Sequence, residues 1–229
     1  MKKRNEATKE PYIISIPIFE GVDFMDIAAP REIFDWLNHD DTFKREVQIY
    51  YVGQGKAFTT NNGVRIIVEA QFTDEHVQHP NLIWVPGGRP DTLGRIIGEQ
   101  NSSFTNYVKR AGAKAEWVCS VCEGAVLLAN TGLLDHYEAT THWNFVNCIA
   151  HNYKKVNLVP GNPRYVKSGN RVTGGGISSG LDEALFLVEL IAGTASAIKI
   201  QQTMQYYPRP PVESTIPEPG ACPVPGLHK

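Results

Sequence analysis

The chain has 229 residues, of which 42% are hydrophobic and 20% are charged, and 22 basic against 24 acidic residues give a net charge of −2. This composition is typical of a soluble globular protein and excludes a disordered chain. No apolar run approaches the ~18 residues that a membrane span requires. The charge balance provides no basic field for phosphate backbones, so we expect neither a nucleic acid nor a membrane as a partner.

The four cysteines are too few for a disulfide scaffold. The first residues also lack the apolar stretch of a secretory signal peptide. We therefore expect a cytoplasmic protein with reduced thiols.

Short apolar runs alternate with segments of helical spacing along the chain. Such alternation predicts an α/β fold whose mainly parallel sheet is covered by helices on both faces. We predict strands at 12–19, 46–52, 64–68, 82–85, 115–121, 156–160, 164–168 and 171–175. We predict helices at 29–38, with Pro30 in the first turn, within 92–112, from 125, up to about 152, and at 179–192.

The composition changes near the C-terminus, where the segment that starts at Pro208 holds seven of the 15 prolines. Such a segment forms neither a helix nor a central strand. We predict one domain at 12–206, preceded by an extension at 1–11 and followed by a proline-rich tail at 207–229. The tail is expected to be an extended arm against the surface or a partner, or to be disordered.

Cys122 is predicted at the turn between a buried strand and a helix. Helix N–H groups at such a turn stabilise an anion and lower the pKa of a thiol, which favours a nucleophilic thiolate; the alternative is an inert buried cysteine. A redox pair with Cys119 is disfavoured because three residues of extended chain span ~10 Å, beyond the ~7 Å limit for a disulfide. Cys148 and Cys222 have no evident role.

Four further residues fall near the same predicted edge of the sheet. Gly87 and Gly88 follow a strand and offer backbone N–H groups to a developing negative charge, although a plain turn would use them equally well. Asp26 is a candidate general acid/base, or else a helix N-cap. Glu123 either polarises the site or caps the next helix.

Other motifs give weaker signals. His142 and Trp143 are candidates for a pocket wall or for a packed pair. His76 and His79 have ligand-like spacing that Pro80 interrupts, so we predict no metal site. The glycines at 174–176 lack the lysine of a phosphate loop and are interpreted as a close turn into the last long helix.

Several motifs in order resemble the ThiJ/PfpI superfamily, which has a flavodoxin-like three-layer fold of the class I glutamine amidotransferase type. They are IPIFEGVDFMDIAAPREIF, IWVPGG, VCSVCEGAVLLANTGLLD, ATTHW and RVTGGGISSGLDEALFLVE. The similarity extends over about 195 residues. The motifs around Asp26, Cys122 and His142 are most similar to the isonitrile hydratase branch and to the sensor domains of AraC-type regulators.

The resemblance implies a homodimeric lyase that hydrates a small isonitrile to an N-substituted formamide without a cofactor. Cys122 would be the nucleophile, Asp26 its acid/base partner, and the amides of Gly87 and Gly88 would help to bind the intermediate. Hydratases usually carry Thr where this chain has Glu123, and the added carboxylate is expected to raise the thiol pKa or to narrow the pocket.

Other members of the superfamily supply the alternatives. A peptidase is disfavoured because no histidine follows Cys122, and a DNA-binding regulator is disfavoured because only the tail follows the domain. A glyoxalase-like hydrolase acting on small carbonyls remains open. So does a non-catalytic sensor in which Cys122 is oxidised reversibly.

Overall fold

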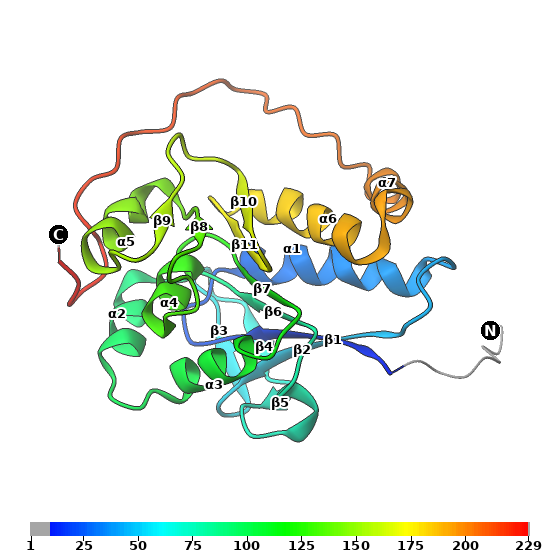
Figure 1. Ribbon diagram of the computed structural model, residues 1–229, viewed down its shortest axis with the longest axis horizontal. Coiled ribbons are helices and arrows are strands. Elements are labelled where there is room, and N and C mark those ends of the chain that lie inside the picture. Colours follow the sequence, from blue (N-terminus) through cyan, green and yellow to red (C-terminus); the bar gives the residue numbers. More distant parts are fainter. Residues whose placement is uncertain (1–9, 229) are drawn as a thin grey trace.

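The computed structural model describes residues 10–228 and shows a seven-stranded sheet between two layers of helices (Figure 1). The strand order is β10-β11-β7-β6-β1-β2-β5, and every pairing is parallel except the antiparallel β10–β11 pair. The predicted α/β fold is therefore confirmed. The strands are β1 (Tyr12–Pro17), β2 (Val47–Gly53), β5 (Ala70–Gln71), β6 (Leu82–Val85), β7 (Trp117–Ser120), β10 (Tyr165–Ser168) and β11 (Arg171–Gly174).

The helices divide between the two faces of the sheet (Figure 1). One face carries α1 (Phe24–Asp35), α6 (Ser179–Ala192) and α7 (Thr194–Thr203). The other carries α2 (Pro90–Gly98), α3 (Ser103–Gly112) and α4 (Gly124–Thr131), with α5 (Val146–Asn152) against α4. Smaller elements are the β3 (Ala57–Thr59) and β4 (Arg65–Ile67) hairpin, the β8 (Glu138–Ala139) and β9 (Asn157–Leu158) pair, and the 3-10 helices η1 (Trp36–His39), η2 (Glu75–Val77) and η3 (Trp143–Phe145).

The central strands are apolar and buried, as strands covered on both faces should be. All four residues of β6 are buried, and Ile14 and Ile16 of β1 are fully buried. Because β6 and β7 are parallel neighbours, their carboxyl ends lie at the same edge of the sheet, where α/β folds place their sites.

Helix α1 differs from the prediction because it begins at Phe24, so that Pro30 lies in its interior and not in its first turn. Proline has no N–H and leaves the carbonyl four residues earlier without a helical donor. Here that carbonyl belongs to Asp26, and the buried Trp84 donates its Nε1–H to it at 2.9 Å. This bond compensates for the proline and fixes the first turn of α1 against β6.

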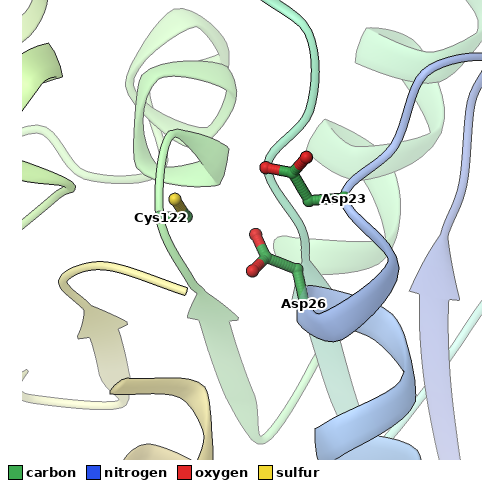
Figure 2. Close-up of side chains that lie close together, drawn as sticks. All are labelled: Asp23, Asp26 and Cys122. Carbon is green, nitrogen blue, oxygen red and sulfur yellow. The ribbon is translucent and has the colours of Figure 1, made fainter. Parts of the chain in front are cut away.

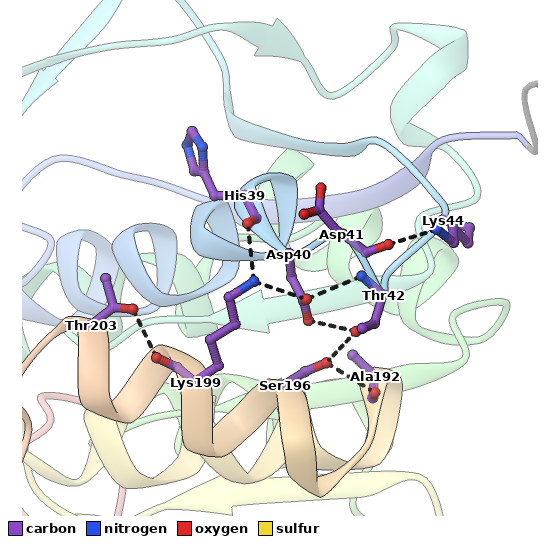
Figure 3. A network of polar contacts seen from close by, with 9 residues as sticks. All are labelled: His39, Asp40, Asp41, Thr42, Lys44, Ala192, Ser196, Lys199 and Thr203. Carbon is purple, nitrogen blue, oxygen red and sulfur yellow. Dashed lines mark hydrogen bonds and ion pairs between the residues drawn. The ribbon is translucent and has the colours of Figure 1, made fainter. Parts of the chain in front are cut away.

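Helix α7 was not predicted, and a network of polar contacts fixes it to the loop after η1 (Figure 3). The buried Asp40 carboxylate accepts hydrogen bonds from the amide and hydroxyl of Thr42, at 3.1 and 2.9 Å, and pairs with Lys199 at 3.3 Å. The Thr42 hydroxyl also lies 3.2 Å from Ser196 Oγ. Burial alone would raise the pKa of Asp40, but hydrogen bonds from Ser196, Thr42 and Lys199 outweigh it and lower that pKa to about 2.

The proline-rich tail crosses the molecule as an extended arm and packs near α5 (Figure 1). Cys148 of α5 forms a disulfide with Cys222, 74 residues later, with Cα atoms 4.8 Å apart. The expectations that all thiols are reduced and that these two cysteines have no role are therefore wrong, because the tail returns to a helix that is distant in sequence. Cys119 and Cys122 are free.

Two other expectations concern the ends and a membrane. The expected extension at 1–11 lies almost entirely outside the described residues. No helix within residues 10–228 combines the length and the apolarity needed to cross a membrane.

Candidate active site

Cys122 lies in the sharp turn between β7 and α4. Its φ of 59° is in the left-handed region, which costs a residue with a side chain about 1 kcal/mol or more. Its amide donates to the Gly174 carbonyl at 3.2 Å, and its carbonyl accepts from the Thr141 hydroxyl at 2.9 Å. Gly124 begins α4 so close to β6 that a Cβ there would lie 2.1 Å from the Val85 carbonyl oxygen. The strained turn is thus held on three sides.

Two carboxyl groups from the start of α1 lie near the Cys122 thiol (Figure 2). The ligand-capable atoms of Asp23, Asp26 and Cys122 all lie within 4.8 Å of one another. Asp26 is fully buried in the first turn of α1, and its Oδ2 accepts from the Gly87 amide at 2.9 Å. Asp23 occupies the N-cap position, so the structure does not support the capping alternative for Asp26.

The buried Asp26 Oδ1 has no hydrogen-bond partner among residues 10–228. Figure 2 shows the Asp26 carboxyl turned toward Cys122. This oxygen is therefore available to exchange a proton with a group bound at the sulfur.

Glu123 is also buried and turns its carboxylate toward the PGG segment. Its Oε1 accepts from the Gly88 amide at 3.0 Å, and its side chain makes no cap hydrogen bond to α4. A Cβ at Gly87 would lie 2.7 Å from Glu123 Cδ, so a glycine is required for the carboxyl to fit. The amides of Gly87 and Gly88 are accordingly bound to protein carboxyls and not open to a substrate oxyanion.

Burial and these carboxyl groups control the protonation of the site. Burial raises the pKa of the Cys122 thiol well above its ordinary value, and the charges of Asp26 and Glu123 raise it further. The low thiol pKa expected from the helix N-terminus is therefore wrong, because desolvation and like charge outweigh the helix N–H groups.

Burial also raises the pKa values of the Asp26 and Glu123 carboxyls. Burial raises the pKa of Asp26 well above its usual range, the charges of Glu123 and Asp23 add to the shift, and the Gly87 amide opposes it. Burial also raises the pKa of Glu123, to about 7. Burial thus favours the protonated carboxyl of Asp26 and the neutral thiol of Cys122.

A third buried carboxyl, Glu183 of α6, lies behind the turn. Its Oε2 would be 2.2 Å from a Cβ at Gly174, the residue whose carbonyl accepts from the Cys122 amide. Neither of its oxygens has a hydrogen-bond partner within the described chain. Burial, and then the charge of Asp26, raises the pKa of Glu183 well above its usual range.

Glu183 was not predicted as a site residue, although the sequence contains a signal for it. The signal is a glutamate on the apolar stripe of a helix, a position where helical spacing calls for an apolar residue. The other buried residues of that stripe include Gly180, Ala184, Leu187 and Val188. Asp23 has no comparable signal, because an acidic residue before a helix is the commonest N-cap.

His142 and Trp143 lie on the wall of a pocket of about 520 Å³ next to the site. His142 Nδ1 accepts from the Asn144 amide at 3.3 Å, and its ring packs 5.4 Å from that of Trp143. Burial lowers the pKa of His142, and the charge of Asp23 opposes that shift. His142 and Trp143 therefore pack against each other and also line the pocket, so the two predicted roles occur together.

Asp23, Asp26 and Cys122 also form a cluster of donor atoms of the kind that can hold a metal ion. A cation there would compete with the protons that burial favours on Asp26 and Cys122. The absence of a metal and of any other cofactor from the reaction stays a prediction.

The sequence pattern of the DJ-1/PfpI family matches residues 13–190 of this chain. This chain belongs to the DJ-1/PfpI family.

Two relatives share substantial identity with this member of the DJ-1/PfpI family. Isonitrile hydratase from Pseudomonas putida is 29% identical over 206 residues, which are 90% of this chain and 83% of the relative. The crystal structure of a ThiJ/PfpI family protein from Pseudomonas syringae has a TM-score of 0.77 at 27% identity, over 88% of this chain and 78% of that one.

A third comparison concerns the fold alone. An AraC family transcriptional regulator from Pseudomonas putida has a TM-score of 0.71 at 14% identity, over 85% of this chain and 100% of that one. The fold of this chain is thus also found in a protein named as a transcriptional regulator.

Proposed function

We propose that the protein hydrates small isonitriles to N-substituted formamides, with Cys122 as nucleophile and Asp26 as proton donor. The observation that carries the proposal is the placement of Asp26 beside the Cys122 thiol, with their ligand-capable atoms within 4.8 Å. The amides of Gly87 and Gly88 each bind one carboxyl oxygen, of Asp26 and of Glu123. The similarity to isonitrile hydratase over 90% of the chain supports the same reaction class.

The arrangement suits an isonitrile better than a carbonyl compound. Addition to a carbonyl places negative charge on oxygen and needs free N–H donors, but both PGG amides are bound to carboxyls. Addition of sulfur to the terminal carbon of R–N≡C places negative charge on that carbon. A proton from a carboxylic acid quenches it directly, and Asp26 is that acid.

The first step forms a thioimidate. The S–H proton of Cys122 passes to the Glu123 carboxylate, whose side chain lies within hydrogen-bonding reach of the thiol, while sulfur bonds to the terminal carbon. Asp26 gives its proton to the same carbon. The product is Cys–S–CH=N–R, with Asp26 now ionised and Glu123 protonated.

The second step consumes one water molecule. Asp26 takes a proton from the water as its oxygen bonds to the carbon, and Glu123 gives its proton to the nitrogen. The carbon–sulfur bond then breaks, and the hydroxyl proton passes through Glu123 to sulfur. The step releases R–NH–CHO and restores the thiol, the protonated Asp26 and the ionised Glu123.

The alternative of a redox sensor has less support from this geometry. Reversible oxidation requires an accessible thiolate, whereas Cys122 is only 2% exposed and burial raises its pKa.

The proposal is tested by incubating the purified protein with a simple alkyl isonitrile and following the formyl proton by NMR. We expect catalytic formation of the N-alkyl formamide, and no consumption of methylglyoxal in a parallel reaction. Absence of formamide above the protein-free rate would contradict the proposed function, and consumption of methylglyoxal would favour the glyoxalase-like alternative. The homodimer and the cytoplasmic location stay predictions.

A further inference from the structure

The segment of residues 208–218, termed the strap, connects two anchored ends. At its start, the Tyr206 hydroxyl donates to Asp182 Oδ1 of α6 at 3.1 Å. Beyond its end, the chain is bonded to α5 through the Cys148–Cys222 disulfide. The strap itself makes no hydrogen bond to any other residue that the structure describes, so its position depends on the two anchors.

The far anchor is built like a fixed contact and not like a loose end. Cys222 and Val224 are buried, and Asn147 Nδ2 donates to the carbonyls of Pro219 and Gly220 at 3.3 and 2.8 Å. A Cβ at Gly94 of α2 would lie 2.7 Å from the Pro225 carbonyl oxygen, so the tail occupies the space over that glycine.

Asn152 and His228 add a reciprocal pair of bonds at the very end of the described chain. Asn152 Nδ2 donates to the His228 carbonyl at 3.3 Å, and the His228 amide donates to Asn152 Oδ1 at 2.9 Å. The disulfide is therefore the covalent part of a larger anchor.

Between the anchors, Ile216 lines the pocket of about 520 Å³ that His142 and Trp143 also line. This pocket is next to the catalytic cluster, because it also contains Met25, the neighbour of Asp26, and Thr141, which donates to the Cys122 carbonyl. Ile216 is 55% exposed and buries no core of its own. Its side chain thus limits the pocket from the solvent side.

We propose that the strap is the outer wall of the substrate pocket, that Ile216 limits the size of the substrate's R group, and that the Cys148–Cys222 disulfide holds this wall in place. The inference rests on the proposed function in assigning the pocket to an isonitrile R group. An external dithiol would transfer two electrons and two protons to the disulfide, giving two thiols and a cyclic disulfide of the reductant, and the freed strap would leave the pocket wider.

The test measures access to Cys122 and needs no turnover. Cys122 is alkylated with iodoacetamide and with a bulky N-aryl maleimide, and the modified peptide is quantified by mass spectrometry. The ratio of the two rates cancels changes in the thiol pKa. The proteins are the wild type, Ile216→Ala, the double variant Cys148→Ser/Cys222→Ser, and Val212→Ala, a strap control that is 75% exposed and does not line the pocket.

We expect the ratio of the rate with the bulky reagent to the rate with the small one to rise at least about tenfold in Ile216→Ala and in the double serine variant, because a single methylene in a hydrophobic pocket changes discrimination by about that factor. It should be unchanged in Val212→Ala. Equal ratios in Ile216→Ala and the wild type would overturn the proposal even if the double variant folds poorly.

The same variants separate this inference from the proposed function. If the ratios change as expected but no isonitrile is hydrated, the role of the strap as a pocket wall is supported and the hydratase proposal fails. If isonitriles are hydrated with the same preference for R-group size in Ile216→Ala and the wild type, the hydratase proposal stands and the strap does not select substrates.

Discussion

The Gly88 amide donates a hydrogen bond to Glu123 Oε1 at 3.0 Å, in the buried space beside the Cys122 thiol. The neighbouring amide of Gly87 binds Asp26 in the same way. Two amides that could have held an oxyanion instead orient two carboxyls around the sulfur. Both carboxyls are thereby held in the buried space around the thiol.

Glu123→Gln is expected to accelerate the alkylation of Cys122 at neutral pH. The side-chain oxygen of the glutamine can still accept the hydrogen bond from the Gly88 amide, but the negative charge that raises the thiol pKa is lost. Each unit by which the thiol pKa falls increases the thiolate fraction about tenfold. The rate with iodoacetamide, measured between pH 6 and 10, reports how the thiolate fraction of Cys122 rises with pH. Superimposable profiles for Glu123→Gln and wild type would contradict this role, and the exposed Glu32→Gln serves as control.

Asp26→Asn is expected to lower isonitrile turnover by about 10²- to 10⁴-fold, the usual contribution of a positioned general acid. Asparagine keeps an oxygen for the Gly87 amide but offers no carboxyl proton. Formamide production and the thermal unfolding midpoint are measured together, with the exposed Asp35→Asn of the same helix as control. Turnover equal to wild type would remove Asp26 from the mechanism.

Glu183→Gln is expected to flatten the decline of stability with rising pH. Because burial raises the folded-state pKa of Glu183, the folded protein binds more protons than the unfolded chain once the pH exceeds about 4.5, the ordinary pKa. Its contribution to stability is greatest below that pH and falls by up to about 1.4 kcal/mol per pH unit toward the folded-state pKa. Urea unfolding at pH 5 and pH 8 measures the difference. Parallel pH dependence of the variant and wild type would show that the folded-state pKa of Glu183 is not raised.

Asp40→Asn is expected to destabilise the protein by about 1 kcal/mol at pH 7, after allowance for solvent near Lys199. The hydrogen bonds that lower the pKa of Asp40 to about 2 stabilise the fold above pH 3.8, and this stabilisation is lost as the pH falls through 2. The gap between variant and wild type should therefore close in acid. A gap that stays constant from pH 7 to pH 2 would contradict this origin, and the exposed neighbour Asp41→Asn is the control.

The strand pattern and the motif order were sufficient to predict the parallel sheet and the family, because buried apolar strands and a strand–turn–helix are local features. Local rules were less reliable at Pro30, where a tertiary donor, Trp84, satisfies the carbonyl that the proline leaves free. They also gave no sign of the bond between Cys148 and Cys222, which depends on the return of the tail across the molecule.

The sequence predicted Cys122, Asp26 and Glu123 at the candidate site, but neither Asp23 nor Glu183 nor the electrostatics of the site. Cys122, Asp26 and Glu123 do come together, yet the raised thiol pKa depends on how many carboxyls share one buried volume. The position of the Asp26 carboxyl in that volume is set by the tertiary hydrogen bonds from Trp84 and Gly87 to the first turn of α1.

In the proposed reaction, Cys122 forms the bond to the isonitrile carbon. The most direct test compares formamide production from an alkyl isonitrile by wild type and by Cys122→Ser, with Cys119→Ser as a control for the other free cysteine. We expect Cys122→Ser to fall to the rate without protein while Cys119→Ser retains turnover. Formamide production by Cys122→Ser at the wild-type rate would show that the thiol is not the nucleophile.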